Sequence, residues 1–207
     1  MQATARKLYS EEEYWTLEET SPVKHEFWDG EIWAMAGGTF NHARVAANVL
    51  GAVQQQLHGK PCVVVGSDLR VKVARSRKRF NTYPDVSIAC PPFQFEKRRS
   101  NVKDTLLNPR VLIEVLSPST ADYDRTSKFD EYKLIDSLTD YIVVWQDRVR
   151  VEHYHRANGQ WFIESYTRRE DTLSLPDLEI TLALEDIYAG LDVPEVLRLL
   201  PELEDEE

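Results

Sequence analysis

The sequence predicts a mixed α/β fold in which a central mixed β-sheet is flanked by helices. Early strand patterns are joined by a tight turn, as in an antiparallel hairpin, whereas later ones alternate with a helix, as in a β-α-β unit. Hydrophobic residues make up 42% and charged residues 29% of the 207 positions, which is typical of a globular chain. We expect one domain over residues 1–207, with a core at about 10–190 and an acidic tail at 195–207.

The N-terminal quarter predicts a helix, a hairpin and a longer helix. Ser10 and Glu13 form a capping box that starts a helix reaching to about Glu19. An Asp-Gly pair lies between apolar runs within His25–Met35, which is a strong hairpin signal. Asn41–Leu57 carries apolar residues at helical spacing, so it should form the longer helix.

The central and C-terminal parts predict four strands, a helix and a second hairpin. The strands are expected over Pro61–Val73, Tyr83–Cys90, Arg110–Leu116 and Tyr141–Trp145. Residues Ser117-Pro118-Ser119-Thr120 end the third strand and offer caps for a helix from about Asp122 to Ser137. The last elements are a hairpin of Val149–His155 and Gln160–Tyr166 across an Asn-Gly turn, and two short helices within Leu182–Leu200.

Cysteine use and hydropathy favour a cytoplasmic protein without a membrane span. Cys62 and Cys90 lie in apolar runs, so we expect buried free thiols, with a disulfide as the less favoured alternative. No run approaches the roughly 18 apolar residues that a spanning helix needs. The first residues also lack the apolar core of a secretory signal.

Charge is segregated along the chain. The net charge is −10, yet residues 68–110 hold eleven basic and four acidic residues, a balance of +7. Residues 195–207 hold six acidic residues and one basic one. The densest basic cluster is Arg75, Arg77, Lys78 and Arg79, which is either a nucleic-acid contact or a solvated loop.

Four side chains carry the candidate chemistry. Glu114 lies within an otherwise apolar strand, and a buried carboxylate is costly unless it is paired or binds a metal. Its structural alternative is an ion pair with Arg110 or Arg125. Asp85 follows a proline at the start of a strand, where a turn or cap is the plainer interpretation. Glu26 precedes the first hairpin turn and could instead pair with Lys24 on the surface.

Lys128 is the fourth side chain. With Tyr132 at i+4 and Ile135 at i+7, it lies on the helical stripe that faces the sheet. Counting residues along the strand and back along the helix places it level with Glu114. Its alternative is a lysine whose stem is buried and whose head reaches solvent.

These residues resemble the PD-(D/E)XK nuclease superfamily, and within it the bacterial Uma-type family of restriction-endonuclease-like proteins. The resemblance runs from about Ser10 to Gly190. The stretches that carry it are His25–Glu31, His42, Tyr83–Ser87, Ile113–Thr120 and Lys128–Tyr132. One position departs from the superfamily pattern, because Leu116 stands where the lysine usually follows the acid.

The resemblance implies a restriction-endonuclease-like core with N-terminal and C-terminal hairpins, Mg²⁺ as cofactor with Mn²⁺ as a substitute, DNA as substrate, and a homodimer. It implies a metal held by Asp85, Glu114 and the carbonyl of Val115. We expect Lys128 to replace the lysine missing at Leu116, and Glu26 to hold a water or a second ion. His42 is either a structural histidine at a helix start or a phosphate contact.

Three functions remain open from the sequence. The first is a Mg²⁺-dependent endonuclease. The second is a catalytically inactive nucleic-acid binder or structural homodimer on the same fold, which Leu116 favours. The third is a glycosidase with paired carboxylates, in which Trp28 and Trp33 stack on sugars. A strand carboxylate beside a lysine suits a phosphate better than a sugar, so the first function is preferred.

Overall fold

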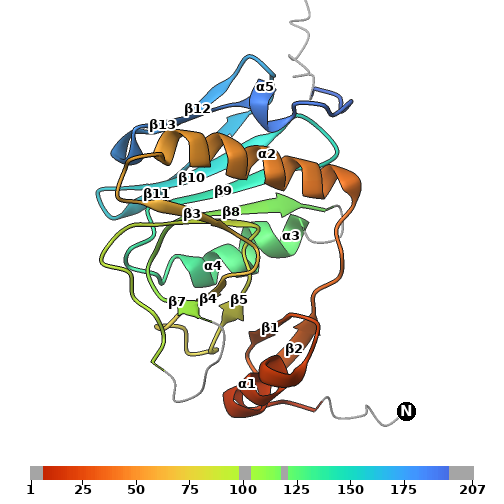
Figure 1. The fold of residues 1–207 in the computed structure, drawn as a ribbon, viewed down its shortest axis with the longest axis vertical. Helices are drawn as coiled ribbons and strands as arrows, with labels where there is room; N and C mark the ends of the chain where they lie inside the picture. The colour runs from red at the N-terminus through yellow and green to blue at the C-terminus, as the bar shows by residue number, and fades with distance from the viewer. Residues whose placement is uncertain (1–6, 98–103, 118–120, 196–207) are drawn as a thin grey trace, which may run out of the picture.

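The computed structural model describes residues 7–97, 104–117 and 121–195 and contains the predicted mixed sheet flanked by helices (Figure 1). The central layer is a six-stranded sheet in the order β11-β10-β9-β8-β6-β3. Strands β8 and β9 are parallel and the other neighbours are antiparallel. Its strands are β3 (Val63–Gly66), β6 (Val86–Ala89), β8 (Pro109–Leu116), β9 (Asp140–Trp145), β10 (Val151–Ala157) and β11 (Gln160–Tyr166).

A second sheet of short strands lies at the lower end of the molecule in Figure 1, beside helix α1 (Glu11–Thr20). Its order is β2-β1-β5-β4-β7. Its strands are β1 (His25–Trp28), β2 (Glu31–Ala34), β4 (Arg70–Lys72), β5 (Asn81–Thr82) and β7 (Thr105–Leu106). Ser10 and Glu13 make both hydrogen bonds of the predicted capping box. This sheet places the first hairpin beside the end of the central sheet.

Helices cover the two faces of the central sheet. Helix α2 (Phe40–Leu57), the hairpin of β12 (Thr172–Leu175) and β13 (Ile180–Ala183), and α5 (Leu184–Ile187) cover one face. A turn of 3₁₀ helix (Pro176–Leu178) joins β12 to β13. The other face carries α3 (Ala121–Tyr123), a π-helical turn (Asp124–Lys128) and α4 (Phe129–Tyr132). Side chains of β8 therefore alternate between two apolar cores, one on each face.

Most long elements match the sequence prediction, and four differ. Residues 61–73 form two strands in different sheets, because a turn separates β3 from β4. The predicted helix over 122–137 ends at Tyr132, although Ile135 remains buried. The region from Leu182 begins as the end of β13 and continues as one helix, and β12 was not predicted. The expected caps at 118–120, residues 98–103 and the tail beyond Glu195 lie outside the described residues.

The expectation of free thiols is wrong, because Cys62 and Cys90 form a disulfide. Strands β3 and β6 are antiparallel neighbours, with Val63 opposite Ala89. The two cysteines therefore face each other one residue beyond this pair. Both are partly buried beside the core that α2 covers. The two cysteines are 28 residues apart in the sequence. The residues around either cysteine therefore do not predict that the two pair.

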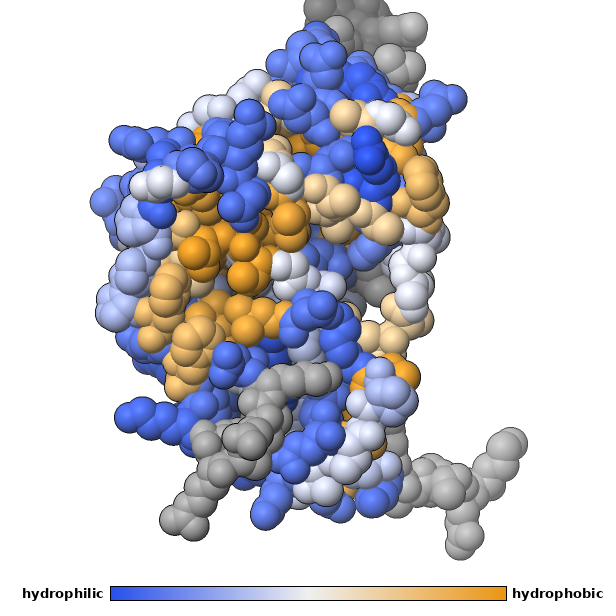
Figure 2. Space-filling model, in the orientation of Figure 1, coloured by the Kyte–Doolittle hydropathy of each residue, from blue (hydrophilic) through white to orange (hydrophobic). Residues whose placement is uncertain are grey.

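Figure 2 shows an apolar patch around β3, at one edge of the central sheet. Val63 of β3 is exposed, as are Phe93 and Phe95 in the segment that follows β6. Among the helices of residues 7–97, 104–117 and 121–195, none is both long and apolar enough to cross a membrane.

Candidate active site

The ends of two neighbouring strands bring Asp85 and Glu114 together. Strand β6 pairs with β8 so that Val86 faces Ile113, and the preceding residue, Asp85, therefore faces Glu114. The backbone N–H of Val115 donates a hydrogen bond to Asp85 Oδ2 at 2.7 Å. Glu114 lies on the face covered by α4 and is only 5% exposed. Residues facing each other across two antiparallel strands are about 5 Å apart, so both acids belong to one site.

Lys128 lies at the end of the π-helical turn, with its amine directed at this pair of strands. Its Nζ is 2.9 Å from Glu114 Oε1, 3.1 Å from Glu26 Oε1 and 3.4 Å from Asp124 Oδ1. The Lys128 side chain is 6% exposed, so its ammonium is buried among the acids. Turns of π helix are rare in proteins, and those that occur are often found at functional sites. The alternative, in which the ammonium of Lys128 reaches solvent, is therefore wrong.

The electrostatics of the cluster are dominated by burial and by an excess of negative charge. Burial raises the pKa of Glu114 to about 8; Lys128 opposes this rise, and Asp85, Asp124 and Glu26 add to it. Burial alone would lower the pKa of Lys128, but Glu114, Glu26 and Asp124 together raise it well above its usual value. Three carboxylates thus surround one ammonium, with Asp85 on the neighbouring strand end, and a further cation near them would be favoured.

Glu26 reaches the same cluster from the first hairpin. Besides Lys128, it accepts a hydrogen bond from the Thr82 hydroxyl on β5. Lys24, the surface partner considered for it, binds Asp68 and the carbonyl of Ser67 instead. The hairpin therefore contributes a third acid to the site, beside those of β6 and β8.

His42 connects helix α2 to Asp85. Its backbone N–H donates to the Thr39 hydroxyl that caps α2, and its Nε2 is 3.0 Å from Asp85 Oδ1. The hydrogen bond with Asp85 raises the pKa of His42 against the opposing effect of burial, and the Val115 backbone adds to the rise. A Cβ on Gly38 would lie 2.7 Å from His42 Cδ2, so only glycine fits there without moving the ring. His42 therefore takes part in the cap of α2 through its backbone and contacts the candidate site through its ring.

The basic loop lies next to this cluster. The Lys78 carbonyl accepts a hydrogen bond from the Asp29 backbone in the hairpin turn, and Lys78 Nζ is 4.6 Å from the Trp28 ring. That ring packs on Tyr123, whose own ring is 6.0 Å from Lys128 Nζ. A surface hollow beside the loop is lined by Trp28, Trp33 and Lys78, among others.

The members of the basic segment differ in accessibility. Arg75, Arg77, Lys78 and Arg79 are exposed, although Arg75 pairs with Asp136 at 2.6 Å. Arg70 is fully buried against Trp15 and Tyr83, and Lys72 pairs with Glu11 and Glu96. The number of basic residues between positions 68 and 110 therefore overstates how much positive charge is exposed to solvent. Among the described residues of this segment, the exposed basic side chains are those of the loop and Lys97.

Two members of the site were missed by sequence reasoning. Asp124 binds Lys128 from the preceding turn, and the Tyr132 hydroxyl donates to Glu114 Oε1 at 2.8 Å. Both are four residues from Lys128, a spacing that places side chains on one helix face and could have found them. The arginines considered as partners of Glu114 lie elsewhere: Arg110 binds Asp177 and Arg125 binds Glu152.

The arrangement provides two kinds of chemistry. Carboxylate and backbone carbonyl oxygens are the ligands that Mg²⁺ prefers, and Asp85, Glu114 and Val115 supply both types at adjoining strand ends. A buried ammonium can stabilise negative charge that develops in a transition state. Together they suit the hydrolysis of a charged ester better than binding of a neutral ligand.

Comparisons with known proteins identify a family and a shared fold. A family model described as "Uma2: Putative restriction endonuclease" matches residues 11–185. The uncharacterized protein slr1290 of Synechocystis sp. is 36% identical over 183 residues, which cover 88% of this chain and 92% of that protein. The uncharacterized protein sll1609 of the same organism is 32% identical over 164 residues, or 79% of this chain and 90% of its own length.

A solved structure resembles this fold. It is the crystal structure of a protein from Anabaena variabilis described as "a putative nuclease belonging to DUF820". The TM-score is 0.64 with 15% sequence identity, over 81% of this chain and 90% of that one. At this identity the likeness establishes the fold, which confirms the restriction-endonuclease-like architecture expected from the sequence.

Proposed function

Because the chain belongs to the Uma2 family of restriction-endonuclease-like proteins, we propose that it is a Mg²⁺-dependent endonuclease that hydrolyses DNA phosphodiester bonds. The observation that supports this most is the buried contact of Lys128 with Glu114 and Glu26, beside Asp85. Different residues support the metal, the catalytic lysine and the substrate in this proposal.

The residues at the strand ends fit a divalent ion. Asp85, Glu114 and the carbonyl of Val115 would hold it, since they are oxygen donors on adjoining strands. The excess of acids over bases in this cluster is the charge that such an ion offsets. When bound, Mg²⁺ or Mn²⁺ would polarise the scissile phosphate and activate the attacking water.

Lys128 has the second role in the proposal. Leu116 is buried in the apolar core at the position where the superfamily pattern carries lysine. The amine of Lys128 instead enters from the helical side and lies against the same acid, Glu114. There it would stabilise negative charge on the phosphate, while Glu26 and Asp124 hold its amine in position.

The exposed basic loop supports DNA as the substrate. Arg75, Arg77, Lys78 and Arg79 would contact backbone phosphates at the entrance to the site. Trp28 and Trp33 line the adjoining hollow and offer stacking surfaces, which favours nucleic acid over a small phosphate ester. The proposed substrate, DNA, favours a cytoplasmic location, whereas the disulfide of Cys62 and Cys90 is of a kind that is rare in that compartment.

A homodimer is also part of the proposal. Strand β3 is an edge of the central sheet; Val63 on it is exposed, and an apolar patch surrounds the strand (Figure 2). A second copy would cover this patch. Sedimentation velocity should give a dimer for the parent chain and a monomer for Val63→Lys. A monomeric parent chain at micromolar concentration contradicts this part.

The experiment for the nuclease proposal is cleavage of plasmid and oligonucleotide DNA with Mg²⁺, Mn²⁺ or EDTA. We expect cleavage with either metal and loss of it with EDTA. Glu114→Gln should abolish cleavage, whereas Glu179→Gln, a change at an exposed glutamate, should not. Two results together would favour the inactive nucleic-acid binder. The parent would show no metal-dependent cleavage, and Asp85→Ala/Glu114→Ala would bind the metal as tightly as the parent does.

A further inference from the structure

Two histidines and a glutamate form a second polar cluster on the edge hairpin of the central sheet. His153 and His155 alternate along β10 and so share one face, and Glu164 lies opposite His153 on β11. One ligand atom from each of the three side chains lies within 4.8 Å of the others. We propose that His153, His155 and Glu164 bind a divalent transition-metal ion of the Zn²⁺ class.

The unsatisfied nitrogens of this cluster point to a ligand. Within the described part of the chain, Nδ1 of His153 and Nδ1 of His155 are buried and have no hydrogen-bond partner. Leaving such atoms unpaired is unfavourable, and most buried polar groups find a partner. A metal ion between the two rings would satisfy both.

Asp140 prepares His153 for this role. Its Oδ1 is 2.7 Å from His153 Nε2, and the side chains are 13% and 4% exposed, respectively. A carboxylate only accepts hydrogen bonds, so Nε2 carries the proton and Nδ1 keeps its lone pair in the neutral ring. Metal-binding histidines almost always have such an outer partner, which fixes the ring and the tautomer.

Ligand type selects the class of metal. Two imidazole nitrogens and one carboxylate suit Zn²⁺ and neighbouring transition metals, whereas Mg²⁺ and Ca²⁺ prefer oxygen ligands. Tetrahedral Zn²⁺ with bonds near 2.1 Å needs ligand atoms about 3.4 Å apart. The three ligand atoms lie within 4.8 Å of one another, and Glu164 is exposed, so its side chain is free to approach an ion between the two rings.

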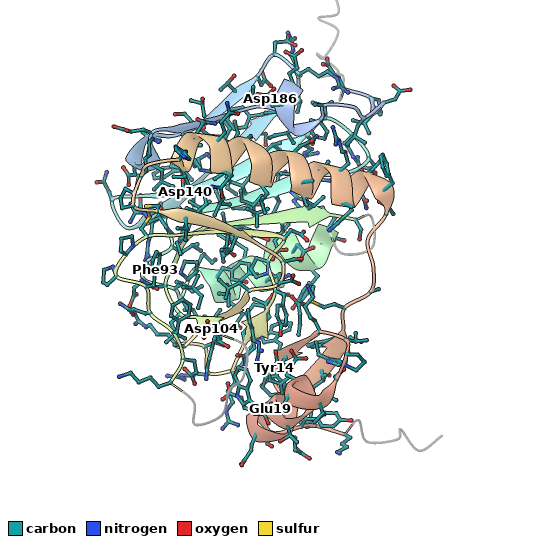
Figure 3. All side chains as sticks on the ribbon, in the orientation of Figure 1. Tyr14, Glu19, Phe93, Asp104, Asp140 and Asp186 are labelled. Carbon is teal, nitrogen blue, oxygen red and sulfur yellow. A yellow bond between two sulfur atoms is a disulfide. The ribbon has the colours of Figure 1, made fainter. Side chains whose placement is uncertain are left out.

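This cluster is separate from the proposed nuclease site. His153 faces Ile142, which belongs to the core covered by α2, whereas Glu114 lies on the face of α4. Asp140 pairs with Val111, three residues before Glu114, or roughly 10 Å along the strand. Figure 3 shows Asp140 at the opposite end of the sheet from the tip of β8. The ion would join the edge strand β11 to β10.

The test is titration of the full-length, metal-stripped protein with Zn²⁺ by calorimetry and with Co²⁺ by visible absorption. We expect one tight site with the ligand-field spectrum of a nitrogen-containing site. Glu164→Gln and His155→Gln should each weaken Zn²⁺ binding at least 10-fold. Asp140→Asn should weaken it 10- to 100-fold, because it acts through His153.

Two variants serve as controls. His58→Gln removes an exposed histidine elsewhere, and Glu114→Gln alters the nuclease site; both should keep the parent affinity for Zn²⁺. Circular dichroism of each apo variant reports folding. Parent affinity retained in His155→Gln/Glu164→Gln overturns the proposal, as does loss of Zn²⁺ binding in Glu114→Gln. Neither result depends on whether the chain cleaves DNA.

Discussion

Lys128 holds one positive charge among Glu26, Glu114 and Asp124, and its removal has two separable effects. Lys128→Met should lower DNA cleavage by at least about 100-fold, because stabilisation of transition-state charge by one group is of that order. Single-turnover cleavage with Mg²⁺ measures this. Lys133→Met, which removes a partly exposed lysine paired with Asp130, is the matched control and should cleave at the parent rate.

The same substitution should also destabilise the fold. Removing one partner of a buried ion pair leaves uncompensated charge and costs about 3–5 kcal/mol. The double variant Lys128→Met/Glu114→Gln should regain part of this free energy of unfolding in urea titrations, while cleavage stays absent. A Lys128→Met protein that cuts DNA at the parent rate would contradict the role given to this residue.

At the scale of elements, the disulfide ties the start of β3 to the end of β6, at the end of β6 opposite to Asp85. Cys62→Ser/Cys90→Ser should lower the free energy of unfolding by about 2–4 kcal/mol relative to the oxidised chain, because the link restricts the unfolded state. Denaturant titration measures the loss, and the parent chain under reducing conditions should match the variant. Equal stability of oxidised and reduced parent chains contradicts this expectation.

The basic loop makes a prediction about salt dependence. Arg77→Ala/Lys78→Ala should weaken DNA binding and flatten the slope of log affinity against log salt by about 0.9 for each phosphate that the loop no longer neutralises. Fluorescence anisotropy with a duplex at several salt concentrations measures this. Lys60→Ala/Arg168→Ala removes the same charge from the region of β12 and β13 and should keep the slope. An unchanged slope in the loop variant means that the loop is only solvated surface.

Over the whole molecule, sequence reasoning succeeded where one residue conflicts with its surroundings. Glu114 interrupts an apolar strand, and Lys128 occupies the buried stripe of a helix, so each needed a partner. The structure places them 2.9 Å apart. The hairpin turns and the helix over 40–57 followed equally from local turn residues and periodicity.

The features that were missed depend on long-range pairing or on irregular backbone. Strands β5 and β7 have two residues each, too few to leave an alternating pattern, and their sheet forms only through pairing across the chain. The disulfide follows from the register of β3 with β6. The segment predicted as one regular helix from 122 to 137 instead contains a π-helical turn, Asp124–Lys128, and ends at Tyr132.

In the proposed site, Asp85 and Glu114 share one divalent ion. Anomalous difference density from crystals soaked in Mn²⁺ tests this without reference to activity. We expect a peak within bonding distance of both carboxylates and the Val115 carbonyl, absent in crystals of Asp85→Ala/Glu114→Ala. A fully occupied Mn²⁺ soak with no density between Asp85 and Glu114 would contradict it.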